Sequence, residues 1–199
     1  MGHNMPHLIL IAGPNGAGKS TAAPGILRGA MSVSQFVNAD TIALGLAAFA
    51  PETASMQAGR VMLERLHQLA ENGEDFAFET TLASKTFAPW IEKLKGEGYQ
   101  FHLVFLTLPS PELAIGRVAE RVRMGGHNVP EEAIRRRYDG GIRNFFKLYR
   151  PLAESWRVYD NSSLSPRLIA HGSGLQVELI AAESAWERLQ EISNGKASI

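Results

Sequence analysis

The sequence predicts an α/β fold, a mostly parallel five-stranded sheet with helices on both faces, in a single domain over residues 1–199. Short apolar runs alternate with longer segments of helical periodicity, and this alternation is typical of a parallel sheet covered by its crossover helices. The composition, 45% hydrophobic and 20% charged, belongs to folded globular chains rather than to disordered ones. A chain of 199 residues is also long enough for one substantial core.

The first apolar run, residues 8–12, is the predicted first strand, and it leads directly into a glycine-rich turn at residues 13–21. Gly13, four further residues and then Gly18-Lys19-Ser20 match the phosphate-binding P-loop, whose backbone N–H groups surround nucleotide phosphates. Glycines at positive φ let the backbone approach those phosphates closely. We therefore expect Lys19 to reach the β- and γ-phosphates of ATP and Ser20 to hold Mg²⁺. The predicted nucleotide-binding positions are Gly13, Pro14, Asn15, Gly16, Ala17, Gly18, Lys19, Ser20 and Thr21.

The next elements alternate as the fold class requires. A helix over residues 20–28 follows the loop, and Pro24 is tolerated there near the helix start. Residues 35–38 form a second predicted strand. A helix then runs to about residue 49 with Asp40 as its cap, and Pro51 ends it.

The middle of the chain repeats the pattern. Residues 53–70 form an amphipathic helix, followed by a buried strand at residues 76–78, a helix over 84–95 and a strand over 99–106. The apolar positions of the first of these helices are Met56, Met62, Leu63, Leu66 and Leu69.

Two helices separated by Gly125-Gly126 are predicted to form a lid over about residues 113–148. The first begins at Ser110 as cap, and the second begins at Pro130. Beyond the lid we expect a fifth strand at residues 156–159. The chain then ends in a hairpin and a last helix, predicted at residues 167–170, 175–179 and 182–192, while Phe145, Phe146, Tyr149 and Trp156 are assigned to the core.

Polar side chains follow four of the predicted strands. Lys19, Asp40, Glu79 and Asp160 each come just after one, and parallel strands place their carboxyl ends on one edge of the sheet. We therefore expect these residues to gather at that edge, where α/β proteins bind their ligands.

The chain resembles the zeta-toxin-like P-loop kinases, whose best-known members phosphorylate UDP-N-acetylglucosamine. The resemblance covers roughly residues 7–161. It is carried by the P-loop, Asn38-Ala39-Asp40, Phe78-Glu79-Thr80-Thr81-Leu82, Arg117 with Arg121, Gly125-Gly126-His127, Pro130 and Arg135-Arg136-Arg137-Tyr138. It implies a nucleoside-kinase-like fold, ATP with Mg²⁺, and an aspartate at about the position of Asp40 that acts as catalytic base. An antitoxin-like protein partner is compatible with it, although no residue indicates one.

The acidic residues have more than one interpretation. Asp40 comes twenty-one residues after Lys19, where its carboxylate can hold an acceptor hydroxyl as a general base or serve only as a helix cap. Glu79, with Thr80 and Thr81, is predicted to bind the acceptor or a magnesium-bound water. Asp40 and Glu79 therefore remain alternatives for a second magnesium ligand.

The arginines are the predicted source of positive charge at the transition state. Arg117 and Arg121 are four residues apart and share one helix face, so that one can stack on adenine while the other neutralises phosphate; the alternative is a solvated face paired with nearby glutamates. We assign Arg121 to catalysis and Arg117 to the nucleotide. Consecutive helical residues point about 100° apart, so not all of residues 135–137 can face the site; we favour Arg136.

Composition excludes several classes of function. Twenty basic residues balance twenty acidic ones, which disfavours nucleic acid as partner, including the alternative of a nucleic-acid end kinase. With no cysteine the chain has no thiolate chemistry and no disulfide, and its apolar runs are too short for a membrane span, so a cytoplasmic protein is expected. His3 and His7 are assigned to a frayed terminus rather than to a metal site.

The sequence therefore predicts an ATP-dependent kinase that moves the γ-phosphoryl group to a hydroxyl of a small molecule, with a nucleotide-sugar such as UDP-N-acetylglucosamine as candidate. The alternative is an ATPase or switch module without an acceptor. An ABC-type ATPase shares the P-loop string, but the chain contains neither a Leu-Ser-Gly-Gly-Gln signature nor an apolar strand ending in Asp-Glu.

Overall fold

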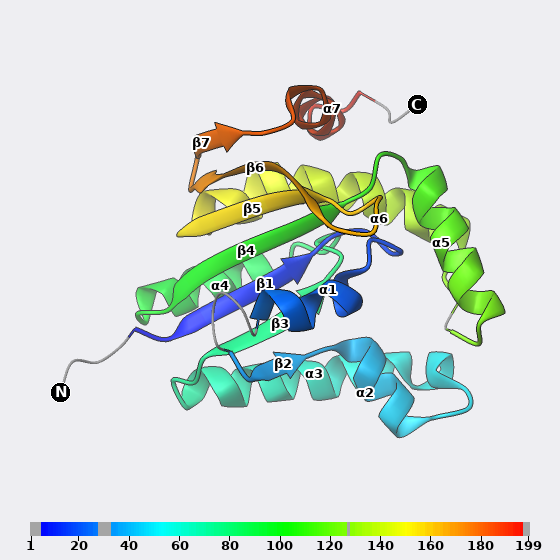
Figure 1. The fold of residues 1–199 in the computed structure, drawn as a ribbon. Coiled ribbons are helices and arrows are strands. Elements are labelled where there is room, and N and C mark those ends of the chain that lie inside the picture. Colours follow the sequence, from blue (N-terminus) through cyan, green and yellow to red (C-terminus); the bar gives the residue numbers. More distant parts are fainter. Residues whose placement is uncertain (1–4, 28–32, 127, 197–199) are drawn as a thin grey trace.

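The computed structural model describes residues 5–27, 33–126 and 128–196. Seven strands within these residues form one sheet in the order β2-β3-β1-β4-β5-β6-β7 (Figure 1). The first five in sequence pair in parallel, and the last two are antiparallel. The strands are β1 (His7–Ala12), β2 (Gln35–Val37), β3 (Phe76–Thr80), β4 (Gln100–Thr107), β5 (Ser155–Asp160), β6 (Arg167–Ser173) and β7 (Gln176–Ile180).

The predicted fold class is confirmed, and the hairpin adds to it. The β6–β7 hairpin pairs with β5 and so extends the parallel sheet instead of standing apart from it. Its turn lies at Gly174, with φ +51°. The described helices are α1 (Lys19–Ile26), α2 (Ala39–Leu46), α3 (Ser55–Glu71), α4 (Phe87–Gly96), α5 (Pro111–Arg123), α6 (Glu131–Asn144) and α7 (Glu183–Ser193), with short turns at Pro51–Ala54, Phe145–Tyr149 and Arg150–Leu152.

Strand β1 is buried on both faces, as expected of a central parallel strand. Leu8 and Leu10 pack with the large cluster that includes side chains of α3, α4, α6 and α7. Ile9 and Ile11 point to the opposite face and pack with Ala23 of α1. The sheet is therefore held between helices, and its carboxyl edge leads into the loops that begin α1, α2 and α5 (Figure 1).

The core assignments near the end of the chain are correct. Phe145, Tyr149 and Trp156 are buried, and Phe146 packs against the same cluster. Trp156 stacks on Trp186 of α7 with ring planes 2° apart, and its indole N–H donates to the Gly174 carbonyl at 2.9 Å. The last helix and the hairpin are thus joined to the main core.

Several predicted boundaries differ from the structure. Helix α2 ends at Leu46 instead of residue 49, and Pro51 begins a helical turn instead of ending one. Pro24 lies inside the eight-residue α1, and the predicted end of that helix at Arg28 falls outside the described residues. On α3, Met56 and Leu63 are exposed although their spacing suggested core positions. No helix among the described residues has the length and apolar character to cross a bilayer.

Candidate functional site

The loop between β1 and α1 has the backbone of a phosphate-binding loop. Gly13, Gly16 and Gly18 all have positive φ, at 143°, 76° and 74°. At Gly13 an added Cβ would lie 2.0 Å from the Leu106 carbonyl oxygen, so only glycine fits between β1 and β4. The Gly13 N–H donates to the Thr80 carbonyl at 3.2 Å, which ties the loop to β3.

Lys19 lies inside this loop with only 7% of its surface exposed. Its Nζ donates to the Pro14 carbonyl at 3.0 Å and is 3.7 Å from Oε1 of Glu79. Burial lowers the pKa of Lys19, and the nearby carboxylates of Glu79 and Asp40 oppose that shift. The structure therefore holds this ammonium group, partly desolvated, at the start of α1.

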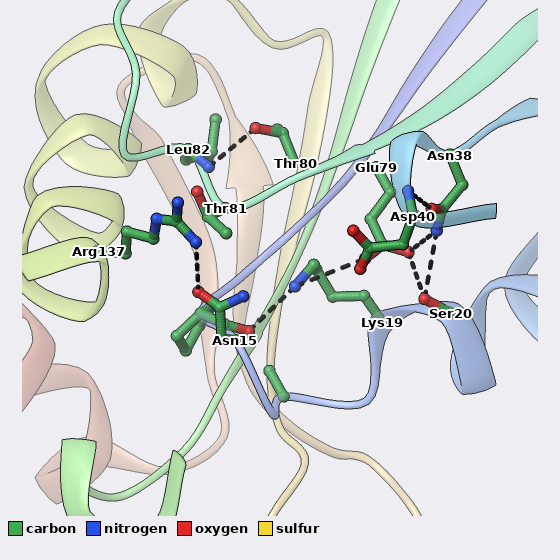
Figure 2. Close-up of polar contacts among 12 residues, drawn as sticks. Asn15, Lys19, Ser20, Asn38, Asp40, Glu79, Thr80, Thr81, Leu82 and Arg137 are labelled. Carbon is green, nitrogen blue, oxygen red and sulfur yellow. Dashed lines mark hydrogen bonds and ion pairs between the residues drawn. The ribbon is translucent and has the colours of Figure 1, made fainter. Parts of the chain in front are cut away.

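Glu79 is the centre of a polar cluster at the carboxyl edge of the sheet (Figure 2). Its Oε2 accepts hydrogen bonds from Ser20 Oγ at 2.7 Å and from Asn38 Nδ2 at 2.8 Å. Asn38 Nδ2 also lies 3.3 Å from Ser20 Oγ. Three elements, β3, α1 and the end of β2, thus bring a carboxylate, a hydroxyl and an amide together.

Asp40 is not the helix cap that the sequence suggested. Asn38 caps α2, because its Oδ1 accepts from the backbone N–H groups of Asp40 at 2.7 Å and Thr41 at 3.1 Å. The Asp40 side chain has no such capping role and lies exposed in the first turn. The sequence reasoning missed Asn38 as a site residue, although its place directly after β2 is a signal for a cap or a ligand.

These groups open onto one cavity of about 580 Å³. That volume lies within the range of small-molecule sites. Its lining brings together loop residues, carboxylates and cations that are far apart in the sequence. The lining residues that carry polar or charged side chains are Asn15, Lys19, Ser20, Thr21, Asn38, Asp40, Glu79, Thr80, Thr81, Ser84, Arg117, Arg121 and Arg137.

Thr80 and Thr81 line the cavity but also shape the chain beside it. Thr80 Oγ1 accepts from the Leu82 N–H at 3.2 Å, and Thr81 Oγ1 accepts from the Ala83 N–H at 3.4 Å. Leu82 itself has φ +58°, which is uncommon for a residue with a side chain. The two hydroxyls therefore stabilise the sharp turn that ends β3.

Arg117 and Arg121 both line the cavity from α5, as their spacing predicted. The Arg117 guanidinium donates to the carbonyls of Asn161 and Ser162, both at 2.8 Å, instead of pairing with a glutamate. Glu112 and Glu120, the expected alternative partners, contact Arg135 and Arg123. Arg117 thus fixes the middle of α5 to the loop after β5.

Among the three consecutive arginines of α6, Arg137 faces the site. Its Nη1 donates to Asn15 Oδ1 at 3.3 Å, and it lines the cavity (Figure 2). Arg136, the residue favoured from sequence, is exposed and is not among the described lining residues. Arg135 pairs with Glu112. Sequence spacing cannot tell which of three consecutive helical residues faces the site, because the rotation of α6 against the P-loop decides it.

Asp160 does not join the group at the edge. Its carboxylate accepts from the Ser162 N–H at 2.8 Å and from Arg167 at 3.1 Å. Burial acts to raise its pKa, but the hydrogen bonds from Ser162 and Arg167 outweigh it and the pKa is lowered. The next residue, Asn161, reaches the P-loop instead, because its Nδ2 donates to the Ala17 carbonyl at 2.7 Å.

A second cavity of about 670 Å³ adjoins the P-loop on the side of Asn161. Gly16, Gly18 and Arg117 line both cavities, so they join at the loop. No group of three or more metal-ligating His, Asp or Glu side chains occurs in the part of the chain that the structure describes. His3 and His127 lie outside those residues, whereas His7, assigned from sequence to a frayed terminus, begins β1, and its Nδ1 is 3.0 Å from Nε2 of His102.

Comparison with solved structures supports the same fold. A chain of the AvrRxo1-ORF1:AvrRxo1-ORF2 complex with sulphate ions has a TM-score of 0.72 at 14% identity, covering 98% of this chain and 65% of that chain. The same complex with ATP gives 0.70 at 15% identity, with the same coverage. A structure of the PezAT chromosomal toxin-antitoxin system of Streptococcus pneumoniae has a TM-score of 0.64 at 19% identity, covering 98% of this chain and 81% of that chain. The chain thus spans about two thirds of the AvrRxo1 chains, and these likenesses show the fold alone.

Sequence comparison gives a relative and a family. An uncharacterized protein of Haemophilus influenzae is 29% identical over 132 residues, which are 65% of this chain and 91% of that protein. A family model described as an AAA domain matches residues 8–140 and so contains most of β1, the P-loop, Asp40, Glu79, the arginines of α5 and Arg137 of α6. Because this match covers more than half of the chain, the protein belongs to this AAA domain family.

Proposed function

We propose that the protein is an ATP-dependent phosphotransferase that moves the γ-phosphoryl group of ATP to a hydroxyl group of a small molecule. One observation carries the proposal: a single cavity is lined by the P-loop residues Lys19 and Ser20 and by the carboxylate of Asp40. A site of this kind can hold ATP, as the phosphoryl donor, and a carboxylate, as the proton acceptor, next to the same acceptor hydroxyl. The structural likeness to a complex solved with ATP supports the choice of nucleotide.

ATP fits the loop because its donors are already arranged. Glycines at positive φ are typical of loops whose backbone N–H groups surround phosphate, and the buried ammonium of Lys19 adds a cation. The adjoining cavity beside Asn161 has room for the nucleoside part. Arg117, which lines both cavities, would then contact the base or ribose from the side of α5.

Mg²⁺ fits the cluster around Glu79. Ser20 Oγ and the Glu79 carboxylate are hard oxygen donors in direct contact, and Asn38 holds the carboxylate in place. The ion, when bound, would neutralise charge on the β- and γ-phosphates. We therefore assign Ser20 and Glu79 to the magnesium side of the site, Glu79 acting directly or through bound water.

Asp40 is then the candidate base. Unlike Glu79 it is exposed, and Asn38 relieves it of the capping role. A carboxylate here can orient the acceptor hydroxyl and take its proton as the new oxygen–phosphorus bond forms. Arg121 and Arg137, which line the same cavity, would stabilise the charge on the equatorial oxygens of the transferring group.

Replacing Asp40 by Asn tests the assignment. Transfer from labelled ATP to an acceptor should fall by roughly 10²–10⁴, while ATP affinity changes little, because the amide cannot accept the proton. Asp75→Asn is the matched control, since Asp75 contacts His7 at the opposite end of the sheet. UDP-N-acetylglucosamine, which the zeta-toxin resemblance suggests, belongs in the acceptor screen.

Two outcomes would contradict the proposal. If no hydroxyl compound stimulates ATP consumption and Asp40→Asn leaves basal hydrolysis unchanged, the protein is an ATPase or switch and not a kinase. If ATP affinity falls together with turnover and excess Mg²⁺ restores it, Asp40 is a metal ligand and Glu79 becomes the candidate for the acceptor side.

A further inference from the structure

Another cavity, of about 340 Å³, also has Asp40 in its lining. It shares Ser20, Asp40 and Arg121 with the main cavity, so the two meet at the proposed base. Its other walls come from α2, the turn before α3 and the end of α5. If Asp40 activates the acceptor hydroxyl, the rest of the acceptor extends into this space.

The walls of this cavity, which we call the α2 cavity, are largely apolar. Ala39, Ala43, Leu44 and Pro51 form one side, with Ser55 beside them. Gly125 and Gly126, which have no side chains, line it too. Among its described lining residues only Asp40 and Arg121 carry a charge, one of each sign.

Large exposed apolar side chains also lie close in sequence to residues that line it. Phe49, Met56 and Met124 are 105%, 75% and 75% exposed, and each is within two residues in sequence of a lining residue. The segments that supply the lining residues are therefore apolar at their surface as well.

Charge decides what the α2 cavity can hold. A diphosphate removed from water needs several cationic or N–H donors around it, as a P-loop provides. The described walls of the α2 cavity supply one guanidinium, which the proposed function already uses at the γ-phosphate, and the carboxylate of Asp40 repels an anion. An uncharged, partly apolar group has no charge to desolvate when it enters, and the burial of its apolar surface lowers the free energy of binding.

We propose that the acceptor is an uncharged hydroxyl compound that carries an apolar group, and that this group binds in the α2 cavity. This inference rests on the proposed function. In the reaction the acceptor oxygen forms a bond to the γ-phosphorus, the bond from that phosphorus to the β–γ bridging oxygen breaks, ADP leaves, and the acceptor proton passes to Asp40. A nucleotide-sugar is thereby disfavoured as substrate.

The test is a screen of matched acceptors with labelled ATP and Mg²⁺. Each neutral compound is paired with a phosphorylated counterpart: nucleosides with nucleoside monophosphates, N-acetylglucosamine with UDP-N-acetylglucosamine, and methyl and butyl glycosides with sugar 1-phosphates. We expect transfer to neutral members only. Within an alkyl series kcat/KM should rise by about fourfold for each methylene that becomes buried.

A pair of variants on α2 locates the binding site. Leu44 lines the α2 cavity and is 53% exposed, whereas Leu46 is 44% exposed and is not among the described lining residues. Leu44→Lys should lower kcat/KM for the preferred apolar acceptor by roughly tenfold or more and improve relative use of anionic ones. Leu46→Lys should change neither, and both variants should melt like the wild type because both positions are exposed.

The outcomes separate this inference from the proposed function. Transfer that favours UDP-N-acetylglucosamine or another phosphorylated acceptor, or equal effects of the two lysine variants, overturns the inference and leaves the kinase assignment intact. Absence of transfer to every acceptor, with ATP still bound, overturns the proposed function and the inference with it.

Discussion

At the scale of single residues, Lys19 makes a prediction about pH. Burial lowers its pKa below the ordinary value of 10.5, so the free protein should lose this cation, and with it ATP affinity, at a lower pH than an exposed lysine would. Titration of a non-hydrolysable ATP analogue between about pH 7 and pH 10 measures this, because affinity should fall as the pH rises through the lowered pKa.

Two variants of Lys19 sharpen that measurement. Lys19→Arg keeps its charge over the whole range, so its affinity profile should be flat whatever its absolute affinity. Lys19→Ala should retain the fold and reduce phosphoryl transfer by several orders of magnitude, roughly 10³-fold or more, because the cation at the transferring group is lost. A flat wild-type profile, or normal turnover in Lys19→Ala, would show that the ammonium does not contact the phosphates.

Asn38 makes the second residue-scale prediction, since it caps α2 and also holds Glu79. Asn38→Ala removes both roles, so the free energy of unfolding should fall by about 0.5–2 kcal/mol for the cap and turnover should fall as well. Asn38→Asp keeps the capping oxygen but places a carboxylate against Glu79. The two adjacent carboxylates repel each other unless a cation lies near them, so Asn38→Asp should lower the free energy of unfolding without Mg²⁺ and regain part of it when Mg²⁺ is added, as urea unfolding at increasing magnesium would report.

At the scale of elements, α5 and α6 carry the lid proposal. Helix α5 ends in a capped turn in which the Gly126 N–H donates to the Arg121 carbonyl at 2.9 Å and Gly125 has φ +87°. An added Cβ at Gly126 would lie 2.6 Å from Cγ of Arg121. The side chain of Arg121 therefore packs against the backbone of the turn that ends α5. This turn ends α5 and so separates it from α6, the second arginine-bearing helix, as the lid proposal requires.

We expect closure of residues 113–148 over ATP. Amide hydrogen exchange in this segment should slow on addition of a non-hydrolysable ATP analogue. Arg121→Ala should lower kcat more than it lowers ATP affinity, whereas Arg123→Ala, on the same helix and paired with Glu120 at the surface, should change neither. Exchange that does not respond to the analogue would contradict the lid.

At the scale of the whole molecule, the single-domain proposal predicts one cooperative unfolding transition. Trp90 packs near Phe76 and Phe78, while Trp156 and Trp186 stack near the hairpin, in another part of the same core cluster. In the variant Trp90→Phe, tryptophan fluorescence comes from Trp156 and Trp186 near the hairpin. In the double variant Trp156→Phe with Trp186→Phe, it comes from Trp90. Within each variant, the urea midpoint from fluorescence should coincide with that from circular dichroism.

Mg·ATP should raise both midpoints together, by an amount equivalent to about 2.7 kcal/mol at a nucleotide concentration one hundred times the Kd. Lys19→Ala should abolish that shift. Separate fluorescence and circular dichroism midpoints in either variant, or stabilisation of one region alone, would indicate that the hairpin and α7 unfold independently of the parallel sheet.

The sequence by itself determined the order of the elements and the identity of the loop. Hydrophobic periodicity and the P-loop spacing are local properties, and they predicted the five parallel strands, the hairpin and the positive φ values at Gly13, Gly16 and Gly18. They also placed Lys19, Asp40 and Glu79 on one edge, because parallel strands put their carboxyl ends together. The family match adds that this arrangement belongs to an AAA domain.

The tertiary structure alone decided which side chain at that edge performs which task. Asn38 rather than Asp40 caps α2, Arg137 rather than Arg136 faces the loop, and Asp160 is held by Ser162 and Arg167 away from the cavity. Each choice depends on the rotation of a helix or the path of a loop by a few ångströms. Distances of that size are set by packing between elements that are remote in sequence. The spacing of residues along the chain does not specify that packing.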